Sequence, residues 1–170
     1  QNLTGKLISN TNLKKGARVV LHKVQKPELF GVARINNKNQ IISIKEKPKK
    51  YLSDLAITGL YFFDNKVVEY SKRLKPSKRG EVEIVDLLKI YKSKKQLSAD
   101  LIGRGGAWLD TGSIEDFYKT SAFVSNIENR QGLKIACLEE IAFNNKWIDK
   151  KKISASIKFY GNCNYSNYLK

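Results

Sequence analysis

The chain has 170 residues, of which 32 are Lys or Arg, 16 are Asp or Glu and one is His, so its formal net charge is +16. A chain of this length suits one domain that buries on the order of 70% of its unfolded surface. Lys greatly outnumbers Arg and the lysines are scattered, which favours a solvated basic surface over a nucleic-acid interface.

Composition bears on location as well. No apolar run approaches the ~18 residues of a transmembrane helix, so we expect no membrane partner. Cys137 and Cys163 lie far apart without metal-ligand spacing and are interpreted as structural or incidental thiols, as in a reducing cytoplasm. His22, the one histidine, stands in a strand-like segment and is given no catalytic role.

The first elements in chain order are strands. Segments 17–24 and 30–35 have strand character and are separated by a turn that contains Pro. Ile42, Ile44 and Glu46 follow at alternate positions, which predicts that they share one face of a third strand. Glu46 then lies where that strand ends, the place where open α/β sheets hold their ligands.

Segment 55–63 is apolar at both alternating sets of positions, which predicts a central strand buried on both faces. Gly59 within it suits the close approach of a backbone or ligand. Helices are predicted in the segments 67–74, 84–91 and 114–127, where apolar residues recur at helical spacing, and further short helices in the segments 138–145 and 149–158. Ser113 and Asp116 form a capping box for the third of these. The last ten residues, rich in Asn and Tyr, are expected to be poorly ordered.

Several short motifs stand in a fixed order. They are Lys26-Pro-Glu-Leu-Phe-Gly-Val32, Glu46-Lys47-Pro48, Ile57-Thr-Gly-Leu-Tyr61, Lys75-Pro-Ser-Lys-Arg-Gly-Glu81, Gly103-Arg-Gly-Gly-Ala107, Ala107-Trp-Leu-Asp-Thr-Gly112 and Arg130-Gln-Gly-Leu-Lys134. Any one of them arises easily by chance, whereas the ordered set is a strong signal. On these motifs the chain, from about Leu7 to its C-terminus, resembles the glucose-1-phosphate thymidylyltransferases.

The resemblance implies an α/β fold: the C-terminal part of a Rossmann-like nucleotidyltransferase, with a mixed sheet and flanking helices. The family's N-terminal half carries a Gly-rich nucleotide loop and a metal-binding Asp, and neither motif occurs in this sequence. We therefore expect residues 1–170 to form a single incomplete domain. The sequence begins with Gln1 and contains no Met, which indicates an internal or processed start. An uncovered apolar face or an unpaired strand edge is expected in consequence.

The resemblance also implies an activity, the formation of dTDP-glucose and pyrophosphate from dTTP and glucose 1-phosphate. The chain alone is expected to be inactive, because the nucleotide phosphates would be held by the other half. Mg²⁺ is the implied cofactor and a homo-oligomer, a tetramer in the family, the implied assembly. The pathway implied is that of dTDP-sugars for rhamnose and polysaccharide synthesis. The alternative is a non-catalytic remnant that binds a sugar phosphate or another subunit.

The resemblance implies roles for those residues of this sequence that stand in the family's motifs. Lys47, Arg79 and Asp110 would be catalytic, with Asp110 holding Mg²⁺, and Arg130 would serve a regulatory nucleotide-sugar site. The sugar phosphate would be bound by Gly31, Glu46, Lys47, Ile57, Gly59 and Arg79.

Structural alternatives to these roles remain open. Asp110 also suits a turn or cap, and Arg79 an ion pair with Glu81 or Glu83. Arg130 equally suits an ordinary helix end before Gly132.

Two positions depart from the family pattern. Phe30 replaces a frequent Tyr, and Gly106 replaces the aromatic residue that commonly precedes Ala107. Trp108 is interpreted as packing beside the loop rather than as a stacking platform.

Overall fold

The computed structural model describes residues 13–77 and 80–170. They form two compact units that divide after Trp108, and each is described by itself. Among the described residues, no helix is long and apolar enough to cross a membrane.

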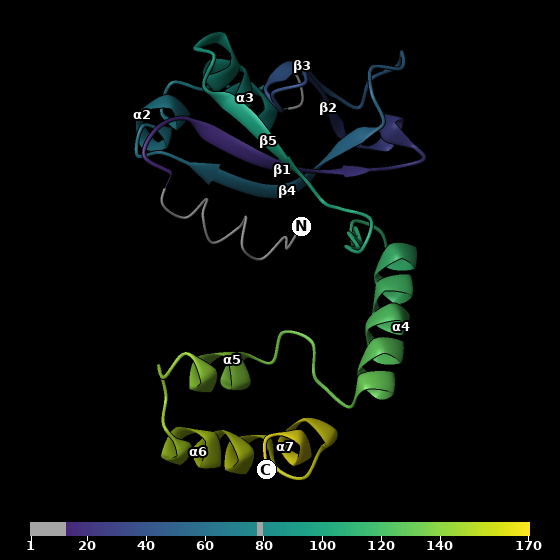
Figure 1. Ribbon diagram of the computed structural model, residues 1–170, viewed down its shortest axis with the longest axis vertical. Helices are drawn as coiled ribbons and strands as arrows, with labels where there is room; N and C mark the ends of the chain where they lie inside the picture. The colour runs from purple at the N-terminus through teal and green to yellow at the C-terminus, as the bar shows by residue number, and fades with distance from the viewer. Residues whose placement is uncertain (1–12, 78–79) are drawn as a thin grey trace. The chain divides into compact units, whose positions relative to one another are not determined.

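The first unit is a mixed sheet with helices against it (Figure 1). Its strands run in the order β3-β2-β4-β1-β5, and every neighbouring pair is antiparallel except the parallel pair of β1 and β5. The strands are β1 (Ala17–Lys23), β2 (Gly31–Ile35), β3 (Ile41–Glu46), β4 (Leu55–Phe63) and β5 (Leu97–Leu101). A 3-10 turn, η1 (Pro27–Leu29), precedes β2. The predicted mixed sheet with flanking helices is confirmed.

Two helices pack on the sheet, α2 (Val67–Ser71) and α3 (Ile84–Ser93). In α3 the buried side chains are Val85, Leu87, Leu88 and Tyr91, so the predicted apolar stripe is confirmed except that Val85 rather than Ile84 is buried. They form one core with apolar residues of all five strands. α2 ends earlier than segment 67–74 predicted.

A buried carboxylate ties the unit together. Asp64, which follows β4, accepts hydrogen bonds from Gly16 N (2.7 Å), Lys66 N (3.1 Å) and the Tyr91 hydroxyl (2.7 Å). Burial raises the pKa of Asp64, but the three donors outweigh it and hold that pKa below its usual value. The carboxylate therefore fixes the start of β1 and the body of α3 to the end of β4.

Two predictions about strand faces were wrong. In β3 the register shifts by one residue opposite Ile35, so Ile41 and Ile44 both enter the core and Ile42 is left 44% exposed. β4 is the central strand, as predicted, but it is not buried throughout, because Leu60 is exposed where the strand bulges away from β1.

The edges of the sheet meet at one point. β3 and β5 are the edge strands, and Gln40 forms a bridge to Ser98 while Ala99 N donates to Asn39 O at 2.8 Å. The expected unpaired edge is thus partly covered by the chain itself.

The second unit is helical. It contains α4 (Ile114–Gln131), α5 (Leu138–Asn144), α6 (Lys150–Tyr160) and α7 (Asn164–Tyr168). Ser113 caps α4 by accepting from Asp116 N at 3.0 Å, and Gly132 ends the helix in the left-handed region at φ +69°. The predicted Ser113 cap and the Gly132 stop are confirmed, but in place of the reciprocal bond of a capping box the Ser113 hydroxyl donates to Asp116 Oδ2 at 2.6 Å.

The C-terminal residues are ordered, contrary to the sequence prediction. The Tyr168 hydroxyl donates to Glu140 at 2.8 Å and the Tyr165 hydroxyl to Glu139, so phenols of α7 bind carboxylates of α5. Polar tyrosine contacts, rather than apolar periodicity, hold this short helix.

Helix α4 exposes apolar side chains within the second unit, whereas the uncovered face was predicted for strands of the sheet. None of its side chains is buried, and Ile114 and Phe117 are 92% and 62% exposed. The amphipathic pattern of α4 therefore lacks a covering surface within the second unit.

Asp64→Asn tests the buried carboxylate. The amide can accept at only one of its two positions, so we expect a loss of about 1–3 kcal/mol in the free energy of unfolding by urea. Because the folded pKa of Asp64 is lowered, its contribution is present at neutral pH and lost as pH falls through that folded pKa. The wild-type chain should thus lose stability in acid more steeply than the variant; parallel pH profiles would contradict this account.

Candidate functional site

Three predicted site residues come together where β2 begins and β3 ends. Gly31 pairs with Glu46 across these strands. A Cβ atom added at Gly31 would lie 2.8 Å from Glu46 Oε2 and 3.6 Å from Ile57 Cδ1. With any larger residue at position 31, the Glu46 carboxylate would have to shift from this place beside Ile57. The arrangement is a carboxylate acceptor set above an apolar floor, which suits the hydroxyl groups and ring of a polar ligand.

Lys47 follows directly and has an unusual backbone. Its φ is +37°, although the residue is not glycine, and its N–H donates to Phe30 O at 3.0 Å. The side chain is exposed. This left-handed residue changes the direction of the chain directly after Glu46, where β3 ends. Lys47 therefore does not continue the side-chain alternation of β3.

β4 bulges beside this cradle. Val19 pairs with Tyr61 and Leu21 with Ile57, so the segment 58–60 stands opposite Val20 alone. Gly59 has φ +83°, and a Cβ atom there would meet nothing within 4 Å. No backbone approaches Gly59 closely within the described residues, so glycine is explained here by its left-handed conformation in the bulge, and a close ligand approach stays a prediction.

Trp108 contacts the bulge of β4. Its Nε1 donates to Thr58 O at 3.2 Å, and its ring meets Phe30 edge-on with centroids 5.2 Å apart. His22 lies at 6.2 Å, also edge-on, and its buried Nδ1 has no hydrogen-bond partner within the described residues. The interpretation of Trp108 as a packing residue is supported, with the addition of a polar anchor to β4.

Tyr61, for which no role was predicted from the sequence, packs against the core and stacks on Phe63 with ring centroids 6.0 Å apart. Burial raises the pKa of its hydroxyl, and the nearby negative charge of Glu46 raises it further. Tyr61 therefore stays protonated and can donate a hydrogen bond next to a carboxylate that accepts them. Its position in the Ile57–Tyr61 motif, at even spacing from Ile57, was the signal available.

The remaining predicted residues lie elsewhere. Arg79 is outside the described residues. Asp110 belongs to the second unit, where it is exposed in the turn before α4, and a Cβ atom at Gly112 would lie 3.1 Å from its Oδ2. A lone carboxylate of this kind suits one ligand position of Mg²⁺. The part of the chain that is described holds no group of three metal-ligating residues, so Asp110 would need oxygen ligands from outside it.

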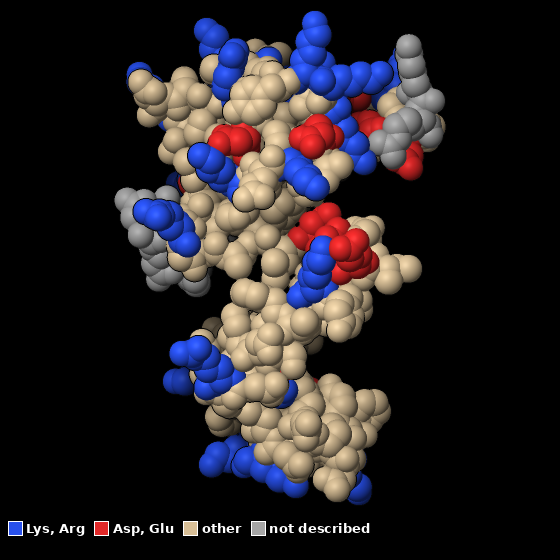
Figure 2. All heavy atoms as spheres, turned by 90° about the vertical axis from the view of Figure 1, so that its right-hand side faces the viewer, with Lys and Arg blue, Asp and Glu red and all other residues tan. Residues whose placement is uncertain are grey.

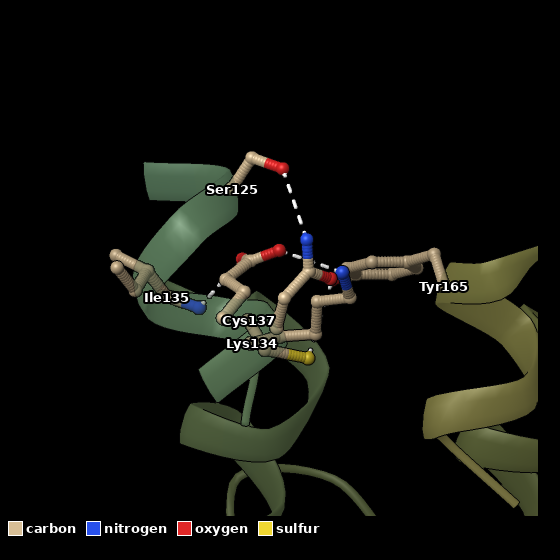
Figure 3. Close-up of polar contacts among 7 residues, drawn as sticks. Ser125, Lys134, Ile135, Cys137 and Tyr165 are labelled. Atoms are coloured by element: carbon tan, nitrogen blue, oxygen red, sulfur yellow. Dashed lines mark hydrogen bonds and ion pairs between the residues drawn. The ribbon is translucent and has the colours of Figure 1, made fainter. Parts of the chain in front are cut away.

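Arg130 lies in the last turn of α4 with an exposed side chain. The segment just beyond is tightly held: Glu128 accepts from Lys134 Nζ at 2.6 Å and from Ile135 N at 2.9 Å (Figure 3). Cys137 Sγ lies 3.3 Å from the Tyr165 hydroxyl in the same view. Arg130 therefore projects from a rigid helix end, which fits both readings of this residue.

The loop before Trp108 is packed more closely than its glycines indicate. A Cβ atom at Gly106 would lie 2.4 Å from Ile102 Cγ2. This close contact accounts for glycine at a position where the resemblance leads one to expect an aromatic residue.

The positive charge is dispersed. Figure 2 shows Lys and Arg side chains in separate groups, with acidic and uncharged surface between them. The view agrees with the interpretation of a solvated basic surface.

The chain belongs to the nucleotidyl transferase family, whose model matches residues 3–127. Solved structures agree on the fold. A glucose-1-phosphate thymidylyltransferase structure from Bacillus anthracis superposes with a TM-score of 0.62 at 41% identity, over 72% of this chain and 49% of that one. A UDP-glucose pyrophosphorylase complexed with UDP-glucose superposes with a TM-score of 0.58 at 26% identity, over 65% of this chain and 44% of that one.

Curated relatives are more specific. Glucose-1-phosphate thymidylyltransferase of Neisseria meningitidis is 46% identical over 154 residues, which are 91% of this chain and 54% of the relative. That of Xanthomonas campestris is 42% identical over 91% of this chain and 52% of the relative. The resemblance drawn from the motifs is confirmed, and the chain spans about half the length of these relatives.

The backbone of Lys47 gives a stability prediction. A side chain in the left-handed region costs about 1–2 kcal/mol, a cost that glycine avoids. Lys47→Gly should therefore be more stable than Lys47→Ala by about 1 kcal/mol in urea unfolding. Both variants lose the same charge, so the comparison isolates the backbone; equal stabilities would show that φ is not constrained here.

Proposed function

We propose that this chain is the sugar-phosphate-binding part of a glucose-1-phosphate thymidylyltransferase. The observation that carries the proposal is the cradle of Gly31, Glu46 and Ile57 beside the β4 bulge. Its carboxylate, apolar floor and phenol match a sugar, and an exposed ammonium group follows at Lys47. The similarity to thymidylyltransferases over 91% of the chain supports this choice of sugar and nucleotide.

The proposed reaction needs alignment more than a protein nucleophile. A phosphate oxygen of glucose 1-phosphate attacks the α-phosphorus of dTTP, pyrophosphate leaves, and dTDP-glucose is formed. Two anions must approach each other in line, so positive charge at the reacting phosphates lowers the barrier.

The chain's own residues divide this work. Glu46 accepts hydrogen bonds from sugar hydroxyls, and Tyr61 can donate one. Ile57 and Gly59 form the wall against the sugar ring. Lys47 offsets the charge of the sugar phosphate, and Arg79 holds it through the paired donors of its guanidinium group.

Mg²⁺ would be held in part by Asp110 and would neutralise charge on the nucleotide phosphates. Because Asp110 is the one site carboxylate proposed for this role, further ligands come from the nucleotide, from water and from the nucleotide-binding part of the enzyme. We place that part in polypeptide corresponding to the other half of the relatives, and we propose that residues 1–170 are inactive without it.

Wider aspects of the proposal follow the relatives. The product would enter dTDP-sugar synthesis for rhamnose and polysaccharides in the cytoplasm. Subunits would assemble as homo-oligomers, for which the exposed apolar side chains of α4 offer area. Arg130 would bind a phosphate of a regulatory nucleotide sugar. Neither a membrane nor nucleic acid is a partner in this proposal.

Complementation tests the activity. The chain is mixed with a separately produced nucleotide-binding half of a close relative, and pyrophosphate release from dTTP and glucose 1-phosphate is measured. We expect activity in the mixture, none from either part alone, and a loss of at least ~100-fold with Asp110→Asn, since a neutral amide is a poor Mg²⁺ ligand. The matched control is Asp86→Asn on the surface of α3, which should keep full activity. Equal activity of the two mutants would overturn the metal assignment, and sugar-phosphate binding without activity would favour the non-catalytic remnant.

Gly31→Ala tests the cradle itself. The added Cβ would lie 2.8 Å from Glu46 Oε2, so the carboxylate must move. We expect the affinity for glucose 1-phosphate, measured by calorimetry, to fall about tenfold or more, as for the loss of a hydrogen bond to a charged group. Gly103→Ala is the control, because a Cβ there meets nothing within 4 Å. Unchanged affinity in Gly31→Ala would show that this placement of the Glu46 carboxylate is not needed for sugar binding.

A further inference from the structure

A hollow of about 460 Å³ lies in the sheet unit, away from the cradle of Glu46. It is bounded by the turn before β1, by Gln40 just before β3 and by the turn between α3 and β5. The described residues that line it include no carboxylate but four cations, which are Lys15, Arg18, Lys94 and Lys95. Gln40 and Glu46 stand at opposite ends of β3, so this basic hollow lies roughly 20 Å from the cradle at ~3.3 Å per residue.

The two turns of the basic hollow are pressed directly together. The backbone N–H of Ala17 donates to Gln96 O at 2.8 Å, and a Cβ atom at Gly16 would lie only 2.6 Å from the same oxygen. Lys95 has φ +57°, a left-handed residue that leads the chain from α3 into β5. Lys15 and Lys95 each stand one residue before this contact. They therefore come from adjacent turns whose backbones are fixed to each other.

Two of the four cations are held in place by neighbouring side chains. Arg18 Nε donates to Ser98 Oγ at 3.2 Å, and its Nη1 lies 3.8 Å from Asp100 Oδ2. Lys94 Nζ lies 5.5 Å from the centroid of the Tyr70 ring. Because these side chains are already ordered, less conformational entropy remains to be lost when a ligand binds to them.

The other groups at the hollow are mainly donors. Lys15 and Lys95 are exposed, and neither has an ion-pair partner among the described residues. Gln40 Oε1 accepts from Asn36 Nδ2 at 2.9 Å, so the amide NH₂ group of Gln40 is the part left to bind a ligand. Ammonium, guanidinium and amide donors without a lining carboxylate suit an anion.

We propose that the basic hollow is a second anion site of this chain, which binds a small ligand with two or more linked phosphate groups. A single phosphate carries at most two negative charges near neutral pH, whereas the hollow presents four cations. A recess lined by charge of one sign concentrates the field and raises the local concentration of counter-ions. The guanidinium group of Arg18 adds directional donors for phosphate oxygens. The site uses none of the residues assigned to the sugar phosphate and does not depend on that assignment.

The test measures binding of inorganic pyrophosphate and of orthophosphate at low salt by calorimetry. Wild type is compared with the double variant Lys15→Gln/Lys95→Asn, in which Asn is chosen because it tolerates the left-handed region. The matched control is Lys151→Gln/Lys158→Gln, which removes two exposed charges from α6. Equal urea midpoints verify that all three proteins are folded. Amide chemical shifts locate the bound anion.

We expect wild type to bind pyrophosphate about tenfold or more tightly than orthophosphate, with shifts at Gly16 and Gln96. Lys15→Gln/Lys95→Asn should lose about tenfold or more in pyrophosphate affinity, the scale of one hydrogen bond to a charged group, and the control should keep it. Equal losses in the two double variants would indicate unspecific charge attraction and overturn the site. Shifts confined to Gly31 and Gly59, or no binding by wild type, would also overturn it. Equal affinity for the two anions would overturn the preference for linked phosphates.

Discussion

A buried carboxylate must find donors, and this requirement organises the sheet unit. Asp64 takes its donors from three segments: the residue before β1, the start of α2 and the last turn of α3. Removing any one of these three donors would leave the buried carboxylate partly without hydrogen bonds. The free energy lost would exceed what most single contacts contribute to stability. The pairing of β1 with β4 is therefore fixed at Ala17 and Phe63. Further along these two strands, between Val19 and Leu21, the register shifts.

The candidate site lies in that interrupted part of the sheet. β2 begins at Gly31, β3 ends at Glu46, and the regular pairing of β4 with β1 is interrupted after Ile57. Regular strand pairing therefore stops in three strands within one region of the sheet. A fully paired sheet offers a ligand only side chains, because its peptide groups are satisfied. Here a carboxylate, a left-handed backbone at Lys47 and a glycine facing open space occur together, and backbone strain of this kind is often found at binding sites.

Sequence patterns predicted much of this arrangement. Alternation and helical spacing gave four strands and the helices α2 to α6, and the resemblance brought Gly31, Glu46 and Ile57 to one place. The bulges escaped prediction, because Ile41, Ile42 and Ile44 fit two registers equally well and only pairing with β2 decides between them. β5 was overlooked although Leu97, Ala99 and Leu101 alternate with the polar Ser98 and Asp100, and α7 was missed because it is held by phenol–carboxylate bonds. The roles of Asp110 and Arg130 stay predictions, since isolated exposed side chains carry no geometric test.

The contact between Gly106 and Ile102 has an evolutionary consequence. Ile102 is β-branched, so its methyl group has little freedom to turn away from a new neighbour. An aromatic residue could enter position 106 only after position 102 had accepted a smaller or unbranched side chain, because the Cβ alone would lie 2.4 Å from the isoleucine methyl. The two positions are therefore coupled, and the effects of substitutions at 102 and 106 should not add.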